Sequence, residues 1–178
     1  MNTMTNDHPA TAELSSTTMD SPVGELTLVA SAAGLRAVLF HAERPDRATV
    51  GPITNTDPAA DEILDRAVQQ LREYFAGDRH EFDLPLDPVG TDFQQQAWME
   101  LRRIPYGQTI SYGEQAKRLG DVRKSRAVGA ANARNPIGIV VPCHRVVGAG
   151  GALTGFGGGL EAKAWLLNHE AGVSDLGL

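Results

Sequence analysis

The chain has 178 residues, of which 42% are hydrophobic and 21% charged, and a formal net charge of -6. This composition is typical of a globular protein and excludes a disordered chain or a coiled coil. The densest apolar runs, 35–40 and 137–141, are far shorter than the roughly 20 residues of a membrane helix. The first fourteen residues lack the basic and apolar regions of a signal peptide. We therefore expect a cytoplasmic protein with no membrane partner.

The charge is divided unevenly along the chain. Residues 1–90 hold 6 Lys and Arg against 15 Asp and Glu, whereas residues 91–178 hold 10 against 7. Between positions 102 and 145, nine basic residues stand against two acidic ones. A positive field of this kind attracts a polyanion even on an acidic protein, although a solvated basic face would have the same composition. The division predicts two domains, of which the second is the candidate for nucleic-acid binding.

We divide the chain into four parts. Residues 1–14 are expected to be a disordered tail, because they hold too few apolar groups to offset the entropy of ordering. Residues 15–84 are expected to form a small α/β domain and 91–178 a mostly helical one. The segment 85–90, with two prolines and a glycine, is the predicted linker. The fold class is therefore α+β.

The first domain begins with three segments that alternate or cluster apolar and β-branched residues. They are predicted to pair as an antiparallel meander: 16–19, 25–31 and 35–41. A helix is expected to follow, with Asp57 as N-cap, Pro58 in its first position and Gly77 at its end. Alternation at 82–84 predicts a further strand.

The second domain is expected to consist of helices joined by short turns. The capping box 91–94 begins a helix that stops before Pro105, and the box 111–114 begins a short helix that Gly120 ends. A third helix is predicted from about 123 to 134. The last two helices have the pattern of a helix-turn-helix, whose second helix reads nucleic acid.

Small residues make up most of the middle of this third helix, and basic residues stand at its ends. Small side chains allow a helix to approach another surface closely. In most proteins such a stripe packs inside the core. Arg126 interrupts the stripe, however, and a basic residue favours an exposed binding face over core packing.

The only cysteine, Cys143, follows a predicted short apolar strand at 137–141 and precedes His144. One cysteine excludes an intrachain disulfide and an all-thiolate metal cage. Cationic or hydrogen-bonding neighbours lower the pKa of a thiol and make it nucleophilic. His144 could accept the thiol proton, directly or through water, and a distant carboxylate could orient the imidazole. The alternative is an inert, buried cysteine.

The sequence Pro142-Cys143-His144-Arg145-Val146, preceded by Asn135-Pro136 and followed by a Gly-rich loop and a helix ending in Asn168-His169-Glu170, resembles the active-site signature of the O6-alkylguanine-DNA alkyltransferases. Four other segments fit the resemblance, which is close over residues 91–172: Pro105-Tyr106-Gly107, Ile110-Ser111-Tyr112, Arg126-Ala127-Val128-Gly129 and Gly157-Gly158-Gly159-Leu160. The family resemblance implies a ribonuclease H-like α/β first domain and a winged helix-turn-helix in the second.

The resemblance also implies the activity. In this family the cysteine attacks the alkyl carbon on O6 of guanine, which makes Cys143 the nucleophile of an irreversible, stoichiometric transfer without a cofactor. His144 would be a water-linked base, and Glu170 would orient it. Asn135 would brace the turn that carries the cysteine.

The implied partner is double-stranded DNA, bound through the minor groove with the alkylated guanine flipped out. Arg126 would fill the gap in the base stack, and Tyr112 would displace the phosphate and donate a hydrogen bond. The other implied DNA contacts come from the third helix: Ala127, Gly129, Ala130 and Arg134. The implied base pocket consists of Pro142, Val146, Phe156 and Gly157. The protein is expected to be a monomer in solution, and cooperative binding along DNA is compatible with this.

Several features depart from relatives. Phe156 stands where many have Tyr, and Gly157 where some have Ser, so polar contacts to the lesion are fewer. An N-terminal zinc site is not expected, because residues 1–90 hold no cysteine. The loop 148–159 lacks a dinucleotide pattern and is expected to be a lid. Two other functions stay open: a catalytically silent, lesion-binding DNA module, and a cysteine hydrolase.

Overall fold

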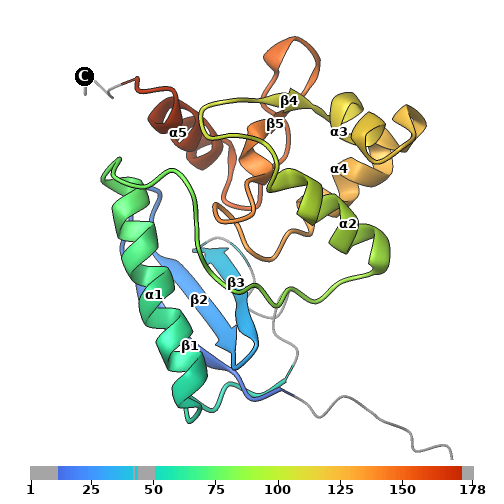
Figure 1. Cartoon of the computed structure of the whole chain (residues 1–178). Coiled ribbons are helices and arrows are strands. Elements are labelled where there is room, and N and C mark those ends of the chain that lie inside the picture. The colour runs from blue at the N-terminus through green and yellow to red at the C-terminus, as the bar shows by residue number, and fades with distance from the viewer. Residues whose placement is uncertain (1–11, 42, 44–50, 174–178) are drawn as a thin grey trace, which may run out of the picture.

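The computed structural model describes residues 12–41, 43 and 51–173. The chain forms two lobes that lie side by side (Figure 1). A three-stranded sheet and one long helix make up the N-terminal lobe, and short helices dominate the C-terminal lobe. The α+β fold class expected from the sequence is confirmed.

The sheet of the N-terminal lobe is an antiparallel meander, as predicted. Its strands are β1 (Ser15–Met19), β2 (Leu26–Ser31) and β3 (Gly34–Phe40), in the order β1-β2-β3. Leu28 is the register partner of Thr17 on one side and of Val38 on the other. Leu14, assigned to the disordered tail, is buried, and its backbone N–H donates to Pro52 O. The folded lobe therefore includes Leu14, whereas residues 1–11 lie outside the described part.

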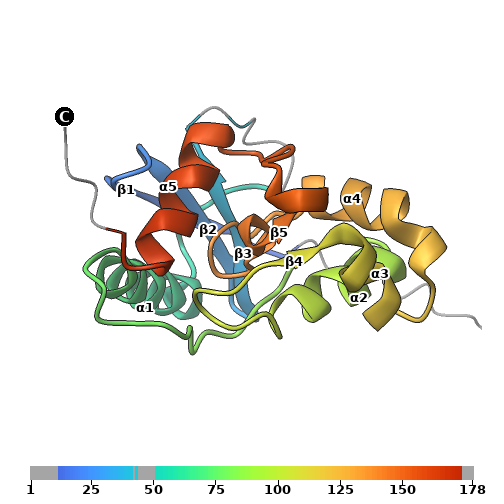
Figure 2. The same ribbon diagram turned by 90° about the horizontal axis from the view of Figure 1, so that it is seen from above.

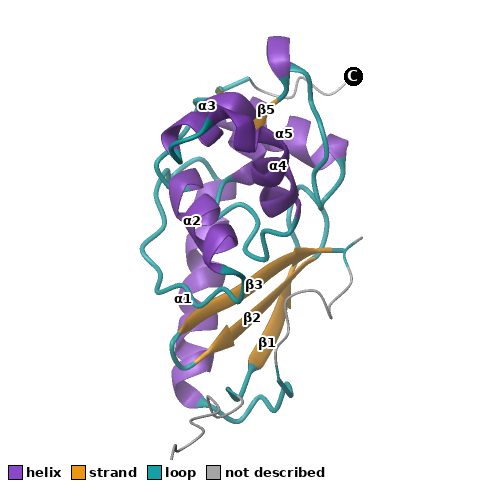
Figure 3. Cartoon of the chain, turned by 90° about the vertical axis from the view of Figure 1, so that its right-hand side faces the viewer, coloured by secondary structure: helices purple, strands orange, loops and turns teal. Residues whose placement is uncertain are grey.

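The helix α1 (Pro58–Phe75) covers one face of this sheet (Figure 3). Asp57 caps it as predicted, since its carboxylate accepts a hydrogen bond from Ala59 N. Gly77 follows the helix end with a φ of 83°, a conformation that favours glycine. The apolar stripe of α1 is buried on the sheet: Ala60, Ile63, Leu64, Ala67, Leu71 and Tyr74.

The strand predicted at 82–84 is wrong, because this segment is irregular in the structure. Leu84 is buried, so its apolar character reflects packing and not strand pairing. The linker segment that follows is held to β3 by two hydrogen bonds of 2.8 Å: Leu35 N donates to Pro85 O, and Asp87 N donates to Leu35 O. The Asp87 carboxylate also pairs with the guanidinium of Arg36. The connection between the lobes is therefore fixed to the sheet edge.

The C-terminal lobe contains short helices, 3₁₀ turns and two short strands. They are α2 (Asp92–Leu101), β4 (Ile110–Ser111), α3 (Tyr112–Arg118), α4 (Ser125–Ala133), β5 (Val146–Val147) and α5 (Leu160–Glu170). The predicted capping box of α2 is present in both directions between Thr91 and Gln94. At α3, Ser111 Oγ accepts from Glu114 N at 3.0 Å.

The helix-turn-helix pair is α3 and α4, which pack against each other. The second helix begins two residues later than predicted. Residues Val122–Lys124 form a 3₁₀ turn that the Asp121 carboxylate caps, so the α-helix starts only at Ser125. Beside this pair, β4 and β5 form a two-stranded parallel sheet.

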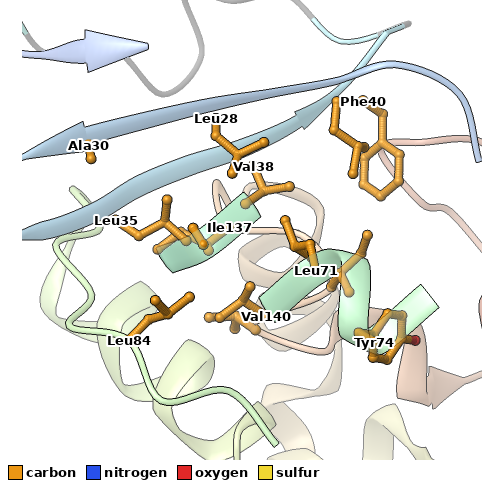
Figure 4. Packing of buried hydrophobic residues seen from close by; sticks show 14 of the residues in the cluster. Leu28, Ala30, Leu35, Val38, Phe40, Leu71, Tyr74, Leu84, Ile137 and Val140 are labelled. Atoms are coloured by element: carbon orange, nitrogen blue, oxygen red, sulfur yellow. The ribbon is translucent and has the colours of Figure 1, made fainter. Parts of the chain in front are cut away.

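The two lobes share one core. Figure 4 shows Ile137 and Val140 of the C-terminal lobe among Leu28, Val38 and Leu71 of the N-terminal lobe. The strand predicted at 137–141 is wrong: one bridge joins Val38 to Ile137, and the chain then turns. This run is apolar because the turn lies inside the shared core. The loop that carries the cysteine is therefore anchored on β3.

The end of α5 lies next to the end of α1, as both the front view and the view from above show (Figures 1 and 2). His169 Nε2 lies 2.7 Å from the carbonyl oxygen of Tyr74, which ties the two helix ends together. None of the helices in the described ranges has the length and apolar character that a membrane span requires.

Candidate active site

The single thiol lies at the start of a 3₁₀ turn, Cys143–Arg145, and is partly exposed. Burial raises the pKa of the Cys143 thiol to about 11, although a hydrogen bond with Asn135 and the positive charge of Lys163 act in the opposite direction. The sequence suggested a lowered pKa, and the structure corrects this because desolvation outweighs the neighbours. The resting thiol is therefore protonated at neutral pH and needs a base in order to react.

The candidate base, His144, is fully buried directly after the thiol. Its Nε2 lies 2.7 Å from Glu170 Oε1. Burial lowers the pKa of His144, and the carboxylate of Glu170 opposes this shift. A neutral imidazole that donates Nε2–H to the carboxylate leaves Nδ1 as an acceptor. This Nδ1 is buried and has no hydrogen-bond partner among the described residues. The ring can therefore take up a proton on that atom.

The carboxylate of Glu170 receives hydrogen bonds from both lobes. His144 Nε2 and Tyr74 Oη lie 2.7 and 2.8 Å from Oε1, and the guanidinium of Arg145 donates to both carboxylate oxygens at 2.8 Å. Gly107 N adds a longer bond of 3.3 Å. Although burial raises the pKa of Glu170, the bonds from His144 and Arg145 hold it well below its usual range. These partners explain an acidic residue in the last turn of a helix, where the macrodipole disfavours it.

Asn135 closes the turn that precedes the thiol. Its Nδ2 donates to Val141 O at 2.8 Å, and its Oδ1 accepts from Ile137 N at 3.0 Å. Both hydrogen bonds join the Asn135 side chain to the backbone, as the family resemblance led us to expect. They fix the backbone immediately before Pro142 and thereby the position of Cys143.

The small residues of α4 lie on two faces. Ala127 and Ala130 are exposed, and so are Arg126 and Arg134. The opposite face is buried: Val128, Ala131 and Asn132. Core packing, which the sequence left open, therefore involves Ala131, whereas Ala127 and Ala130 leave a solvent face with small side chains. Arg126 has no ion-pair partner in the part of the chain that the structure describes, so its charge is available to a ligand.

Tyr112 lies between α4 and the glycine-rich loop. A Cβ added at Gly129 would stand 3.8 Å from the Tyr112 ring, so the ring packs against the helix at its glycine. The Tyr112 hydroxyl accepts a hydrogen bond from Thr154 Oγ1 at 3.0 Å. The structure thus brings Tyr112, α4 and this loop together on one side of the lobe.

The implied base pocket is backed by the N-terminal lobe. Pro142 and Val146 are buried, and the Phe156 ring packs edge to face on Phe40 of β3 with centroids 5.1 Å apart. A Cβ added at Gly157 would overlap the carboxylate of Glu43. Glycine at this position, where some relatives have serine, therefore fits the close approach of a side chain from the other lobe.

Three further buried residues of the site were not assigned a role from the sequence. Lys163 Nζ donates to Val146 O at 2.7 Å and to Thr154 O at 2.9 Å. It thereby fixes the glycine-rich loop 148–159, which we call the pocket loop. Arg145 and Tyr74 hold Glu170. Arg145 could have been identified from the sequence, because it belongs to the motif around Cys143. No local sequence feature identifies Tyr74, because it lies 96 residues from its partner Glu170. Among the described residues no group of His, Cys, Asp or Glu has the arrangement of a metal site.

Comparisons with known proteins match most of the chain. A family model for the ribonuclease-like domain of 6-O-methylguanine DNA methyltransferase matches residues 14–88, and the model for its DNA-binding domain matches 92–172. The methylated-DNA--protein-cysteine methyltransferase of Mycobacterium tuberculosis (H37Rv) is 50% identical over 155 residues, which are 86% of this chain and 90% of the relative. That of Methanosarcina acetivorans is 45% identical over 151 residues, with 85% and 94% covered.

Solved structures agree with these matches. The crystal structure of Mycobacterium tuberculosis OGT in complex with DNA has a TM-score of 0.77 and 48% identity, and the match covers 89% of this chain and 95% of that one. A methyltransferase of Methanococcus jannaschii has a TM-score of 0.61 and 25% identity, with 91% and 95% covered.

The Arg145→Met substitution should destabilise the protein strongly. It leaves the Glu170 carboxylate buried without its cationic partner, a change that typically costs about 3 to 5 kcal/mol. Urea denaturation should measure this loss in the free energy of unfolding. The matched control is Arg123→Met. The Arg123 side chain is 88% exposed in its pair with Asp121, so its loss should lower the free energy of unfolding by less than about 1 kcal/mol. Equal losses in the two variants would contradict the role of Arg145.

The Gly158→Ala substitution should displace the pocket loop. An added Cβ would stand 2.6 Å from Cδ1 of the Phe40 ring, and overpacking of this kind typically costs about 1 to 3 kcal/mol. We expect a lower melting temperature and slower alkyl transfer. The control is Gly155→Ala, where an added Cβ would meet none of the described atoms within 4 Å. An unchanged rate of transfer in Gly158→Ala would show that packing on Phe40 does not determine the position of the loop.

Proposed function

Because this chain belongs to the 6-O-methylguanine DNA methyltransferase family, we propose that it repairs DNA directly, by moving the alkyl group from O6 of guanine to the sulfur of Cys143. One observation carries the assignment of the residues. His144, the residue directly after the single thiol, is buried with its imidazole on the Glu170 carboxylate, and the same lobe carries a helix with a small and basic solvent face.

The transfer balances without a cofactor. The thiol proton of Cys143 passes to Nδ1 of His144, directly or through one water, and the sulfur forms a bond with the alkyl carbon. The bond between that carbon and O6 breaks, its electron pair stays on the guanine, and the proton held by His144 passes to the guanine, directly or through water, so that the imidazole becomes neutral again. Glu170 stabilises the imidazolium that forms in between, as in other nucleophile-base pairs with an orienting carboxylate.

The product on the protein is a thioether, which has no good leaving group. The chain has no second cysteine that could take over the alkyl group. Each molecule should therefore act once, and the described residues of one chain supply the thiol, the base and the pocket. We take the active unit to be a monomer on duplex DNA.

The exposed face of α4 is the proposed DNA contact. Its alanines and Gly129 would let the helix enter the minor groove closely, where sequence readout is poor and lesion repair needs none. Flipping the nucleotide costs a few kcal/mol, and Arg126 would offset part of this by filling the stack. Tyr112 lies between α4 and the pocket loop, where it could displace the phosphate and donate to the departing base.

The two alternatives have less support. A catalytically silent DNA-binding module would have no use for a buried ionised carboxylate next to a histidine, since such a charge is costly to bury. A cysteine hydrolase would use the same thiol and imidazole, but it gives no role to the exposed basic face of α4. Intact mass and released product together separate the three functions: transfer adds one alkyl group to the protein, hydrolysis releases product and leaves the protein unchanged, and simple binding does neither.

The Cys143→Ser variant should lose transfer and keep DNA binding. A hydroxyl is almost isosteric with a thiol but is a far weaker nucleophile at neutral pH. Intact-mass spectrometry after incubation with an O6-methylguanine duplex should show one added methyl group on the wild type and none on the variant. Affinity for the duplex should stay within a few fold of wild type. Methylation of the variant would place the acceptor elsewhere.

The Arg126→Ala variant should separate binding from base flipping. On a duplex the missing side chain leaves a gap in the stack, which we expect to slow transfer by about tenfold or more, because stacking contacts are typically worth about 1 to 3 kcal/mol. On a flexible single strand no stack has to be filled, so transfer should change little. Single-turnover rates on both substrates test this. Equal losses on both would make Arg126 a phosphate contact only.

A further inference from the structure

Tyr74 is the one residue of the N-terminal lobe whose described contacts include a hydrogen bond to the Glu170 carboxylate. It lies in the last turn of α1 and is fully buried. Figure 4 shows its ring at one end of the core cluster, with the hydroxyl oxygen turned away from the labelled aliphatic side chains. That hydroxyl donates to Glu170 Oε1 at 2.8 Å. Oε1 is also the oxygen that His144 Nε2 contacts.

We infer that Tyr74 is a positioning residue for alkyl transfer: its hydroxyl fixes the Glu170 carboxylate and, through the shared oxygen, sets the basicity of His144. The inference rests on the proposed function, in which His144 accepts the thiol proton. It also gives the N-terminal lobe a part in the reaction, although none of that lobe's residues reacts.

The ring of Tyr74 is held in place from several sides. Phe75, Tyr106 and His169 each meet it edge to face, with centroids 5.3, 6.1 and 5.3 Å away. The backbone carbonyl of Tyr74 lies within hydrogen-bond distance of His169 Nε2. Both the side chain and the backbone of Tyr74 are thus tied to the last turn of α5. A donor so firmly packed loses little entropy when it orients the carboxylate.

The hydroxyl of Tyr74 can act only as a donor toward this oxygen. Burial raises the pKa of Tyr74 far above its usual value, and the charge of Glu170 raises it further. The phenol therefore stays protonated at the pH values at which His144 titrates. A donor on a carboxylate oxygen withdraws negative charge from it, which weakens the support that the oxygen gives to a protonated imidazole.

The charged and titratable groups that face His144 come from three elements. They are Arg145 on its own turn, Lys163 and Glu170 on α5, and, through Glu170, Tyr74 on α1. Arg145 and Lys163 lower the pKa of His144, whereas Glu170 raises it. Without the Tyr74 hydroxyl, Glu170 would support the imidazolium more strongly. The pKa of His144 should therefore rise, and the acid limb of the rate profile should move to higher pH.

The test is the Tyr74→Phe variant of the full chain. It keeps the ring and removes one oxygen. The single-turnover rate of methyl transfer from an O6-methylguanine duplex should be measured from acid to alkaline pH. We expect the acid limb to move up by about half a pH unit, and the neutral-pH rate to fall by about tenfold, as is typical when a partner that orients a reacting residue is lost.

The matched control is Tyr106→Phe. Its ring also packs on Tyr74, but its hydroxyl has no hydrogen bond in the part of the chain that the structure describes. The control should keep the wild-type profile, because it removes the same group without touching Glu170. If the acid limb of the rate profile shifted by the same amount in both variants, or in neither, the inference would be overturned.

A second measurement does not depend on transfer. The His144 imidazole can be titrated by NMR in free wild-type and Tyr74→Phe protein, and its pKa should be higher in the variant. If the wild type failed to methylate Cys143, the proposed function would fall while this titration still decided the coupling. If the variant did not fold, the wild type would decide it: the Tyr74 hydroxyl proton should be protected from exchange and should shift as His144 titrates, and a rapidly exchanging proton would overturn the inference.

Discussion

The buried carboxylate of Glu170 is the constraint on which the rest of the structure depends. An ionised group in the interior costs several kcal/mol unless donors surround it. Here they come from α1, from the turn at Gly107 and from the turn that carries the thiol. Arg145, His144 and Gly107 supply donors from within the C-terminal lobe, and docking of the lobes adds the Tyr74 hydroxyl to the same carboxylate. The N-terminal lobe therefore completes the set of donors around Glu170.

The burial of the site also determines the protonation state of the thiol. Because burial raises the pKa of Cys143 to about 11, the resting sulfur is protonated and weakly nucleophilic. A thiol that can be used once is protected in this way from electrophiles in solution. In the proposed reaction the neutral His144, whose pKa burial lowers, takes the thiol proton when an alkylated guanine lies against the sulfur. Reactivity is thus a property of the assembled complex and not of the cysteine alone.

The sequence predicted the elements that local chemistry decides. Asp57 and Pro58 marked the start of α1, the capping box at 91–94 marked α2, and alternation gave the three strands. It failed at 82–84 and 137–141, where apolar residues are buried by irregular chain in the shared core. The motif residues could be expected at the site, but Tyr74 and Lys163 could not, because only the tertiary fold brings their polar atoms to distant partners.

Residues with little or no side chain serve two opposite purposes in this fold. Gly138 and Gly158 leave room for the Phe40 ring, so that β3 can press against the cysteine turn and the pocket loop. The exposed Ala127 and Ala130 leave room on the outside of α4, where no residue of the described chain fills it. The first pair lets β3 pack directly behind the pocket, and the second pair keeps the proposed DNA-binding face of α4 open. In the proposed function, a flipped base would then meet a wall that the N-terminal lobe holds in place.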